Sequence, residues 1–273
     1  MSEAEKKTAI ITGGTSGIGL AVARKLHAQG SRVALLSERP QAEIDAVCET
    51  LGGVAAGVSG RQCDVRFREQ TKSVVDAIVA QNGSVDILVN SAGLSTLDMV
   101  CAADEDATRM MVDVNFHGAY NMILALLPHM QARRSGNIVN IASAAAALGP
   151  SGQAIYAATK AALVMLTETL PQQLKGQGIR INAVGPGAVR TPMTAMIHTP
   201  PSDAMRAIRD HIGRLVPSPD PSGDYILEPD HIANIVLWLC SPASWGVNGT
   251  FILADHGLST SWSGLPSNLE GIG

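Results

Sequence analysis

Short apolar segments alternate with longer amphipathic segments along most of the chain. The apolar segments lie at residues 8–12, 32–37, 60–65, 86–90, 136–143, 179–187 and 249–255. Their nearly continuous hydrophobicity is typical of strands that are covered on both faces. Amphipathic periods at 20–30, 43–53, 104–131, 152–176 and 230–241 predict helices between them. This alternation predicts an α/β fold with a doubly wound parallel sheet of about seven strands and helices on both faces.

No linker or repeat interrupts the alternation, so we expect a single domain over residues 1–273. Two stretches break the rhythm. Residues 191–228 are rich in proline and hold one short predicted helix, and Tyr225 is expected to be an exposed aromatic there. This stretch is either a lid over a substrate or an insertion without a role. Residues 261–273 show no periodicity and predict an irregular C-terminal tail.

Composition narrows the class of protein. Hydrophobic residues make up 46% of the chain and charged residues 16%, with a net charge of -4. Without a basic block, nucleic acid is not an expected partner. No apolar run is long enough to cross a membrane, and no signal sequence is found, so we expect a cytoplasmic protein. The cysteines are too scattered to predict a metal site and are expected to be buried thiols: Cys48, Cys63, Cys101 and Cys240.

A glycine-rich turn, TGGTSGIG at residues 12–19, joins the first predicted strand to the first helix. Glycines let a backbone turn sharply beside a pyrophosphate, and the following helix N-terminus offers N–H groups to it. An ordinary glycine-rich loop is the alternative, but the position after an apolar strand favours dinucleotide binding. The predicted contacts in this turn are Gly13, Thr15, Ser16, Gly17, Ile18 and Gly19.

The turn resembles the T-G-x-x-x-G-x-G motif of the short-chain dehydrogenase/reductase family. Other blocks resemble that family in the same order, from about residue 8 to 260: CDV, NSAG, DVNFHG, IVNIAS, YAATK and VGPGAVRTPM. The resemblance implies a Rossmann fold and an oxidoreductase that uses NAD or NADP. It also implies further cofactor contacts at Asp64, Val65, Asn90, Ala92, Gly93, Tyr156, Lys160, Pro186, Gly187, Val189 and Thr191. The chain departs from the family pattern at Ser91, Asn248 and His256.

Tyr156 and Lys160 are four residues apart and would share one face of a helix. A neighbouring ammonium favours the phenolate, but moving a tyrosine pKa from about 10 to about 7 requires roughly 4 kcal/mol. A desolvated ammonium together with a positive nicotinamide ring could supply that energy. A half-buried tyrosine with a solvated lysine is the alternative for the pair alone.

By resemblance, Tyr156 is the catalytic acid or base and Lys160 tunes it and binds the nicotinamide ribose. Ser143 would orient the substrate oxygen, with Ser151 as a weaker candidate. Asn115 would kink its helix and hold a water that links Lys160 to solvent.

The end of the second strand decides between NAD and NADP, because a carboxylate there binds a ribose hydroxyl and an arginine binds a 2′-phosphate. Counting from Gly30 places Ser37 at this position, whereas counting back from the apolar helix positions places Glu38 there. The helix register favours Glu38 and therefore NAD. Arg39, the next residue, keeps NADP as the alternative.

Uncharged residues are expected around the substrate: Ser95, Ala144, Ala145, Leu148, Met193, Met196 and Ile197. They favour a secondary alcohol or ketone. An NADPH-dependent 3-oxoacyl-[acyl-carrier-protein] reductase is the alternative, for which Arg206, Arg209 and Arg214 offer some basic surface. A dinucleotide sensor without catalysis is a third reading, disfavoured because Asn115, Ser143, Tyr156 and Lys160 are all present. Resemblance implies a homotetramer, with a dimer as the alternative, built on the helices at 104–131 and 152–176.

Overall fold

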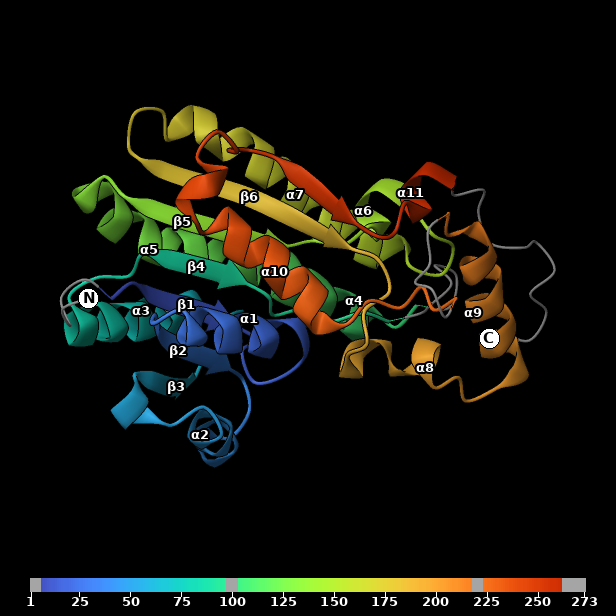
Figure 1. Cartoon of the computed structure of the whole chain (residues 1–273), viewed down its shortest axis with the longest axis horizontal. Helices are drawn as coiled ribbons and strands as arrows, with labels where there is room; N and C mark the ends of the chain where they lie inside the picture. The colour runs from blue at the N-terminus through green and yellow to red at the C-terminus, as the bar shows by residue number, and fades with distance from the viewer. Residues whose placement is uncertain (1–5, 97–102, 218–222, 262–273) are drawn as a thin grey trace.

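A seven-stranded parallel sheet forms the centre of the molecule (Figure 1). The computed structural model describes residues 6–96, 103–217 and 223–261. Across the sheet the order is β3-β2-β1-β4-β5-β6-β7. β2 and β3 are added outward on one side of β1 and the last four strands on the other, so the strand order switches between β1 and β4, which pair in parallel. This confirms the predicted doubly wound sheet. The strands are β1 (Thr8–Thr12), β2 (Arg32–Ser37), β3 (Val58–Gln62), β4 (Ile87–Asn90), β5 (Gly136–Ile141), β6 (Ile179–Pro186) and β7 (Phe251–Ala254).

Helices cover both faces of this sheet, as its apolar strands require. One face carries α1 (Gly17–Ala28), α2 (Gln41–Glu49) and α10 (Pro229–Leu239). The opposite face carries α3 (Arg68–Asn82), α5 (Ala119–Arg133) and α7 (Ala154–Gln173). Fully buried side chains of these helices, such as Ile44 and Leu126, fill the space against the strands. Because helices cover both faces of the sheet, a ligand site is expected at its edge, outside the carboxyl ends of the strands.

Two of the differences between predicted and observed elements affect the site. β3 ends at Gln62 rather than at residue 65, so Asp64 and Val65 lie in the turn that follows it. The predicted helix over 104–131 consists of α4 (Glu105–Val112), a π-helical turn η4 (Asp113–Gly118) and α5. The extra residue of a π turn offsets the two helical halves. The interruption lies at Asn115, where a kink was expected.

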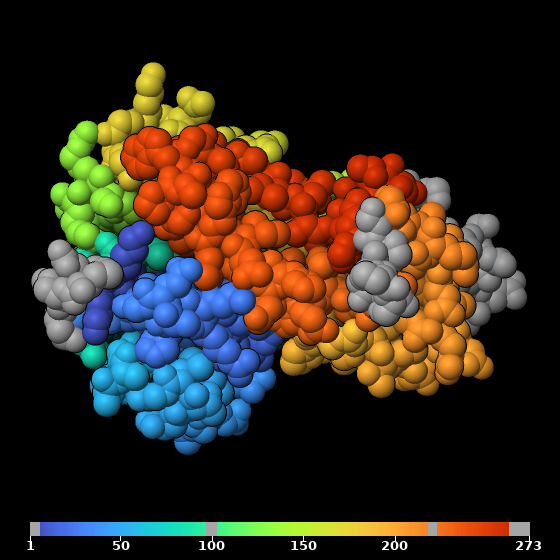
Figure 2. Space-filling model, viewed as in Figure 1, coloured from blue at the N-terminus to red at the C-terminus, as the bar shows by residue number. Residues whose placement is uncertain are grey.

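Residues beyond β6 build a separate layer past the carboxyl ends of the strands (Figures 1 and 2). It contains η5 (Pro192–Thr194), α8 (Ala195–His198) and the longer α9 (Asp203–Leu215). Figure 2 shows α8 and α9, in orange, projecting at one end of the molecule. These elements belong to the stretch for which the sequence left a lid and an insertion without a role as alternatives, and the lid stays a prediction.

Tyr225 corrects the prediction of an exposed aromatic, because only 8% of this residue is exposed. Its hydroxyl donates a hydrogen bond of 2.9 Å to the Arg209 carbonyl, and its ring packs with Val216 and Leu258. The reason is a short parallel bridge between Val189 and Leu227, which draws this segment against the end of β6. Residues 223–228 therefore form an anchored support under α9.

The remaining short elements are η2 (Val54–Ala56), α6 (Ala145–Leu148), η6 (Pro242–Ser244) and α11 (Leu258–Ser261). Cys48, Cys63 and Cys240 are buried free thiols, as predicted, and burial raises their pKa values to about 11, 11 and 12. Cys101 and most of the predicted tail lie outside the described residues. Within the described ranges, no helix is long and apolar enough to span a membrane, and no cluster of three metal-ligating side chains is found.

His256 provides a stability test, because it is a non-glycine residue with a φ of 54°. The left-handed region costs side chains of this kind up to about 1 kcal/mol. We therefore expect His256→Gly to raise the free energy of unfolding by about 0.5–1 kcal/mol in urea denaturation. The control Gly257→Ala, at a φ of 79°, should lower it. A loss of stability in His256→Gly would show that the imidazole makes contacts worth more than the strain.

Candidate active site

A cleft of about 620 Å³ opens at the carboxyl ends of the strands. It lies at the point where the strand order switches, between the neighbouring strands β1 and β4. It is lined by the turns that follow β1, β2, β3, β4, β5 and β6. Most residues predicted for cofactor or catalysis line it: Gly13, Thr15, Ser16, Gly17, Ile18, Glu38, Arg39, Asp64, Val65, Ala92, Gly93, Ser143, Tyr156, Lys160, Pro186, Gly187, Val189 and Thr191. Gly19, Asn90 and Asn115 lie behind this lining.

The backbone of the glycine-rich turn packs so tightly at Gly13 and Gly19 that neither position has room for a side chain. A Cβ atom on Gly19 would lie 2.4 Å from the Gly13 carbonyl oxygen. A Cβ on Gly13 would lie 3.0 Å from the backbone of Ala92, in the loop after β4. The N-terminus of α1, at Gly17, therefore opens directly into the cleft with its first N–H groups available to an anion. These features fit the pyrophosphate of a dinucleotide.

Asn90 and Asn140 join the two central strands behind the cleft. The Asn90 amide donates a hydrogen bond of 2.9 Å to Asn140 Oδ1, and Asn140 Nδ2 donates to Thr167 Oγ1 at 2.9 Å. All three side chains are buried. Asn90 therefore acts on the cleft by fixing β4 against β5 and α7.

Ser143, Tyr156 and Lys160 meet at the end of β5. Tyr156 and Lys160 share one face of α7 and are only 9% and 4% exposed. The Lys160 ammonium donates a hydrogen bond of 3.0 Å to the Ile141 carbonyl and lies 5.8 Å from the centre of the Tyr156 ring. The Ser143 hydroxyl is close enough to the Tyr156 phenol to lower its pKa by hydrogen bonding to the ionised form. Lys160 is therefore buried, and the alternative of a half-buried tyrosine with a solvated lysine is wrong.

Burial raises the pKa of the Tyr156 phenol, and a hydrogen bond from Ser143 to its ionised form offsets only part of that rise. The predicted lowering requires the positive nicotinamide ring beside the desolvated lysine, so it stays a prediction. The lysine itself is buried, which lowers the pKa of its ammonium to about 8. In the protein alone, Tyr156 therefore keeps its proton at neutral pH.

Asn115 lies in the π turn and is 1% exposed. Its Oδ1 accepts a hydrogen bond from the Leu94 N–H at 2.7 Å, while its Nδ2 donates to the Leu94 carbonyl at 2.9 Å and to Thr159 Oγ1 at 3.1 Å. These bonds fasten the loop after β4 to the helix that carries Tyr156. A Cβ on Gly93 would lie 3.3 Å from both Asn115 Oδ1 and Lys160 Nζ, so the three residues converge.

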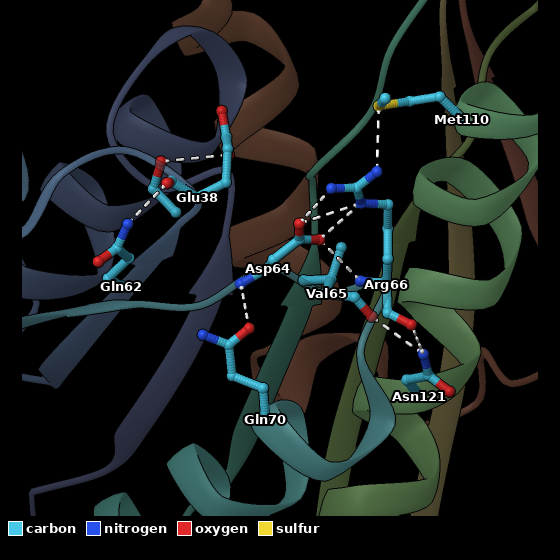
Figure 3. Close-up of polar contacts among 9 residues, drawn as sticks. Glu38, Gln62, Asp64, Val65, Arg66, Gln70, Met110 and Asn121 are labelled. Atoms are coloured by element: carbon cyan, nitrogen blue, oxygen red, sulfur yellow. Dashed lines mark hydrogen bonds and ion pairs between the residues drawn. The ribbon is translucent and has the colours of Figure 1, made fainter. Parts of the chain in front are cut away.

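The other end of the cleft is charged (Figure 3). Ser37 is the last residue of β2 and is buried, and its Oγ accepts hydrogen bonds from Thr15 Oγ1 and the Arg39 N–H, both at 3.3 Å. Glu38 and Arg39 follow it and are exposed. The Arg39 guanidinium is 3.8 Å from the Glu43 carboxylate, an exposed pair of little strength.

Sequence reasoning missed Arg66, which lines the same end of the cleft. Its guanidinium binds the Asp64 carboxylate at 2.6 Å, and this hydrogen bond holds the pKa of Asp64 below its usual range. Position alone gave no signal, because the pairing depends on a tight turn in which the Arg66 N–H also donates to Asp64 Oδ1.

Only part of the predicted substrate pocket lines the cleft. Ser95 and Met193 do, together with Leu94, Pro192 and Thr194, none of which carries a charge. Ala144 and Ala145 are buried, Leu148 packs under α9, and Met196 and Ile197 are not among the lining residues. Apart from the Lys160 ammonium, the residues at the reaction end of the cleft are therefore uncharged.

Burial of Lys160 predicts a characteristic pH dependence of stability. Its pKa is about 8 in the folded protein and 10.5 unfolded, so the unfolded state binds more protons between these values and stability rises with pH. Below pH 8 the buried charge destabilises the fold by about 3 kcal/mol. We expect the difference in unfolding free energy between wild type and Lys160→Met to shift by about this amount from pH 8 to 10.5, measured by urea denaturation. Parallel profiles would contradict the burial of a charged lysine.

Comparison with known proteins agrees with this geometry. The short chain dehydrogenase family model matches residues 7–201. A 3-oxoacyl-[acyl-carrier-protein] reductase FabG of Thermotoga maritima is 33% identical over 254 residues, 93% of this chain and 98% of that protein. The FabG protein of Staphylococcus epidermidis is 34% identical, covering 92% of this chain and 98% of its own.

Among solved structures, an actinorhodin polyketide ketoreductase variant with NADPH has a TM-score of 0.85 and 31% identity, covering 95% of this chain and 99% of its own. The structure of gox2181 has a TM-score of 0.83 and 29% identity, covering 94% and 98%. The chain belongs to the short-chain dehydrogenase family and is an oxidoreductase that transfers a hydride between a nicotinamide cofactor and an alcohol or ketone carbon.

Proposed function

We propose that this protein reduces an uncharged ketone to a secondary alcohol, with NADPH as the reductant. The observation that carries the proposal is the position of the buried Tyr156 phenol, which lines the cleft together with Ser143 and Lys160 at the end of β5. Burial raises the pKa of this phenol, which favours its protonated form. A protonated phenol is a general acid, which reduction of a carbonyl needs, whereas alcohol oxidation needs a phenolate.

The residues divide the reaction between them. The bound cofactor supplies the hydride. Ser143 donates a hydrogen bond to the substrate carbonyl oxygen and fixes it beside the Tyr156 hydroxyl. Tyr156 transfers its proton to that oxygen as negative charge develops on it. Lys160 holds the site in register through the Ile141 carbonyl, and the π turn at Asn115 is the route by which a proton returns from solvent.

Charge at the adenosine end supports NADPH over the NADH that the sequence favoured. The strand-end position is Ser37, whose neutral hydroxyl does not repel a 2′-phosphate. Arg39 lines the cleft next to it with only a weak pair to Glu43. The polyketide ketoreductase that this chain resembles was solved with NADPH. Glu38 is the residue that would instead select NADH by binding the ribose hydroxyl.

Reduction of an acyl-carrier-protein substrate is the second candidate, and it is supported by the names of the FabG relatives. The basic residues of α9 give it little further support. Arg209 pairs with Asp210 at 2.7 Å, and Arg206 lies 3.6 Å from Asp203. With its charges largely balanced within the helix, α9 is not a strongly basic docking surface for an acidic carrier.

We also propose a homotetramer in the cytoplasm, as predicted, with a dimer as the alternative. Large apolar side chains on α5 and α7 support assembly, because Tyr120 is 38% and Met165 58% exposed. Light scattering that gives the mass of one subunit would contradict it.

Removing the phenol hydroxyl tests the reaction. We expect Tyr156→Phe to lower kcat for ketone reduction by at least about 100-fold, because it removes the general acid. NADPH binding, followed by nicotinamide fluorescence, should stay within about threefold of wild type. Unchanged turnover in Tyr156→Phe would contradict the proposal. Wild-type protein that binds NADPH but reduces no ketone would favour a dinucleotide sensor.

Arg39→Gln tests the cofactor. A charged hydrogen bond to the 2′-phosphate is worth about 1.5–3 kcal/mol, so we expect NADPH to bind about 10–100-fold more weakly and NADH to be unaffected. Arg61→Gln is the matched control, because Arg61 binds Gln81 and does not line the cleft. Wild type that binds NADH more tightly, with Glu38→Gln abolishing the preference, would restore the prediction of NAD.

A further inference from the structure

The Arg66 guanidinium is held rigidly at the adenosine end of the cleft. Its Nε lies 3.0 Å from both oxygens of Asp64, its Nη2 lies 2.6 Å from Oδ2, and its backbone N–H donates to Oδ1 at 3.1 Å (Figure 3). The same guanidinium extends toward α4, where Nη1 lies 3.3 Å from Met110 Sδ. Arg66 thus bridges the turn after β3 to α4 across the cleft.

The Arg66 guanidinium lies over the ring of Phe67. The Cζ atom is 5.3 Å from the ring centre, at the distance of a cation–π contact. Phe67 is 58% exposed, so its ring is not placed by packing in the core. Arg66 lines the cleft and Phe67 does not, so the ring contacts the guanidinium without occupying the cavity.

The Asp64 carboxylate fixes the Arg66 side chain. Three N–H groups of Arg66 point at this carboxylate, and the Nε proton is shared between its two oxygens. Hydrogen bonds between charged groups are stronger than neutral ones. Asp64 therefore positions Arg66 in the cleft and keeps about one acceptor position for another donor.

We propose that Arg66 is the platform on which the adenine ring of the dinucleotide stacks, with Phe67 behind it. This inference rests on the nicotinamide dinucleotide of the proposed function. A planar guanidinium stacks on aromatic faces, and every base has such a face. The contacts to Asp64 and Met110 fix the plane in advance, so that little side-chain freedom is lost when the base binds.

Stacking rather than charge is the basis of this contact. The Asp64 carboxylate neutralises the guanidinium at close range, so the pair adds little net attraction for phosphates. Two consequences distinguish a stacking arginine from one that acts only through its charge. Arg66→Lys keeps the charge but loses the planar face, so it should lose the contact. Raised salt should weaken the binding of adenosine only slightly.

Cofactor fragments test the proposal. We expect Arg66→Ala and Arg66→Lys to weaken ADP-ribose binding, measured by calorimetry, by about 10-fold or more. Ketone reduction with reduced nicotinamide mononucleotide, which has no adenosine, should be unchanged in kcat/KM. Arg61→Lys is the matched control and should leave both measurements at the wild-type value.

Phe67→Ala keeps the test decisive if Arg66→Ala does not fold, and it should weaken ADP-ribose about threefold or more without affecting the mononucleotide. Full rescue of binding by Arg66→Lys would overturn the proposal in favour of a charge contact. Unchanged ADP-ribose binding in folded Arg66→Ala would also overturn it. Wild type that binds ADP-ribose through Arg66 but reduces no ketone would refute the proposed function and leave this inference intact.

Discussion

The Lys160 ammonium is buried at the end of β5 and held by the Ile141 carbonyl, and the reaction end of the cleft depends on this bond. A desolvated charge is costly, so it persists only where the surrounding structure fixes its partner. The hydrogen bond sets the register of α7 against β5. Tyr156, one helical turn earlier, then lies beside Ser143, two residues beyond Ile141. One interaction therefore aligns the helix, the strand end and the proton donor.

The two ends of the cleft differ in charge because different turns supply them. Uncharged residues such as Leu94 and Met193 line the cleft together with Tyr156 and the Lys160 ammonium. The turns after β2 and β3 add charged residues of both signs to the lining: Glu38, Arg39, Asp64 and Arg66. A dinucleotide spanning both would place its neutral reduced ring in the uncharged part and its adenosine in the charged part. The division of charge thus matches the division of the ligand.

The sequence predicted the doubly wound sheet, because most strands are apolar and most of the helices between them are encoded by local periodicity. It did not predict α3, and β3 is largely polar. It also predicted the groups that meet at the strand ends, such as Ser143 and Tyr156, through motifs of fixed spacing. It failed where the answer depends on tertiary contacts. Tyr225 is buried by the bridge between Val189 and Leu227, which no local pattern encodes. Likewise, Arg66 is positioned by a turn only a few residues long, which no local pattern identifies.

The pH dependence of hydride transfer to a ketone tests the central claim most directly. Single-turnover reduction by NADPH should be monitored in a rapid-mixing instrument from about pH 6 to 10. The reduced nicotinamide ring is neutral, so nothing in it opposes the raised pKa of the buried phenol. We expect the rate to be constant through neutral pH and to fall only at the alkaline end. A rate that rises with pH through the neutral range would show that a phenolate is the active form and would contradict this account.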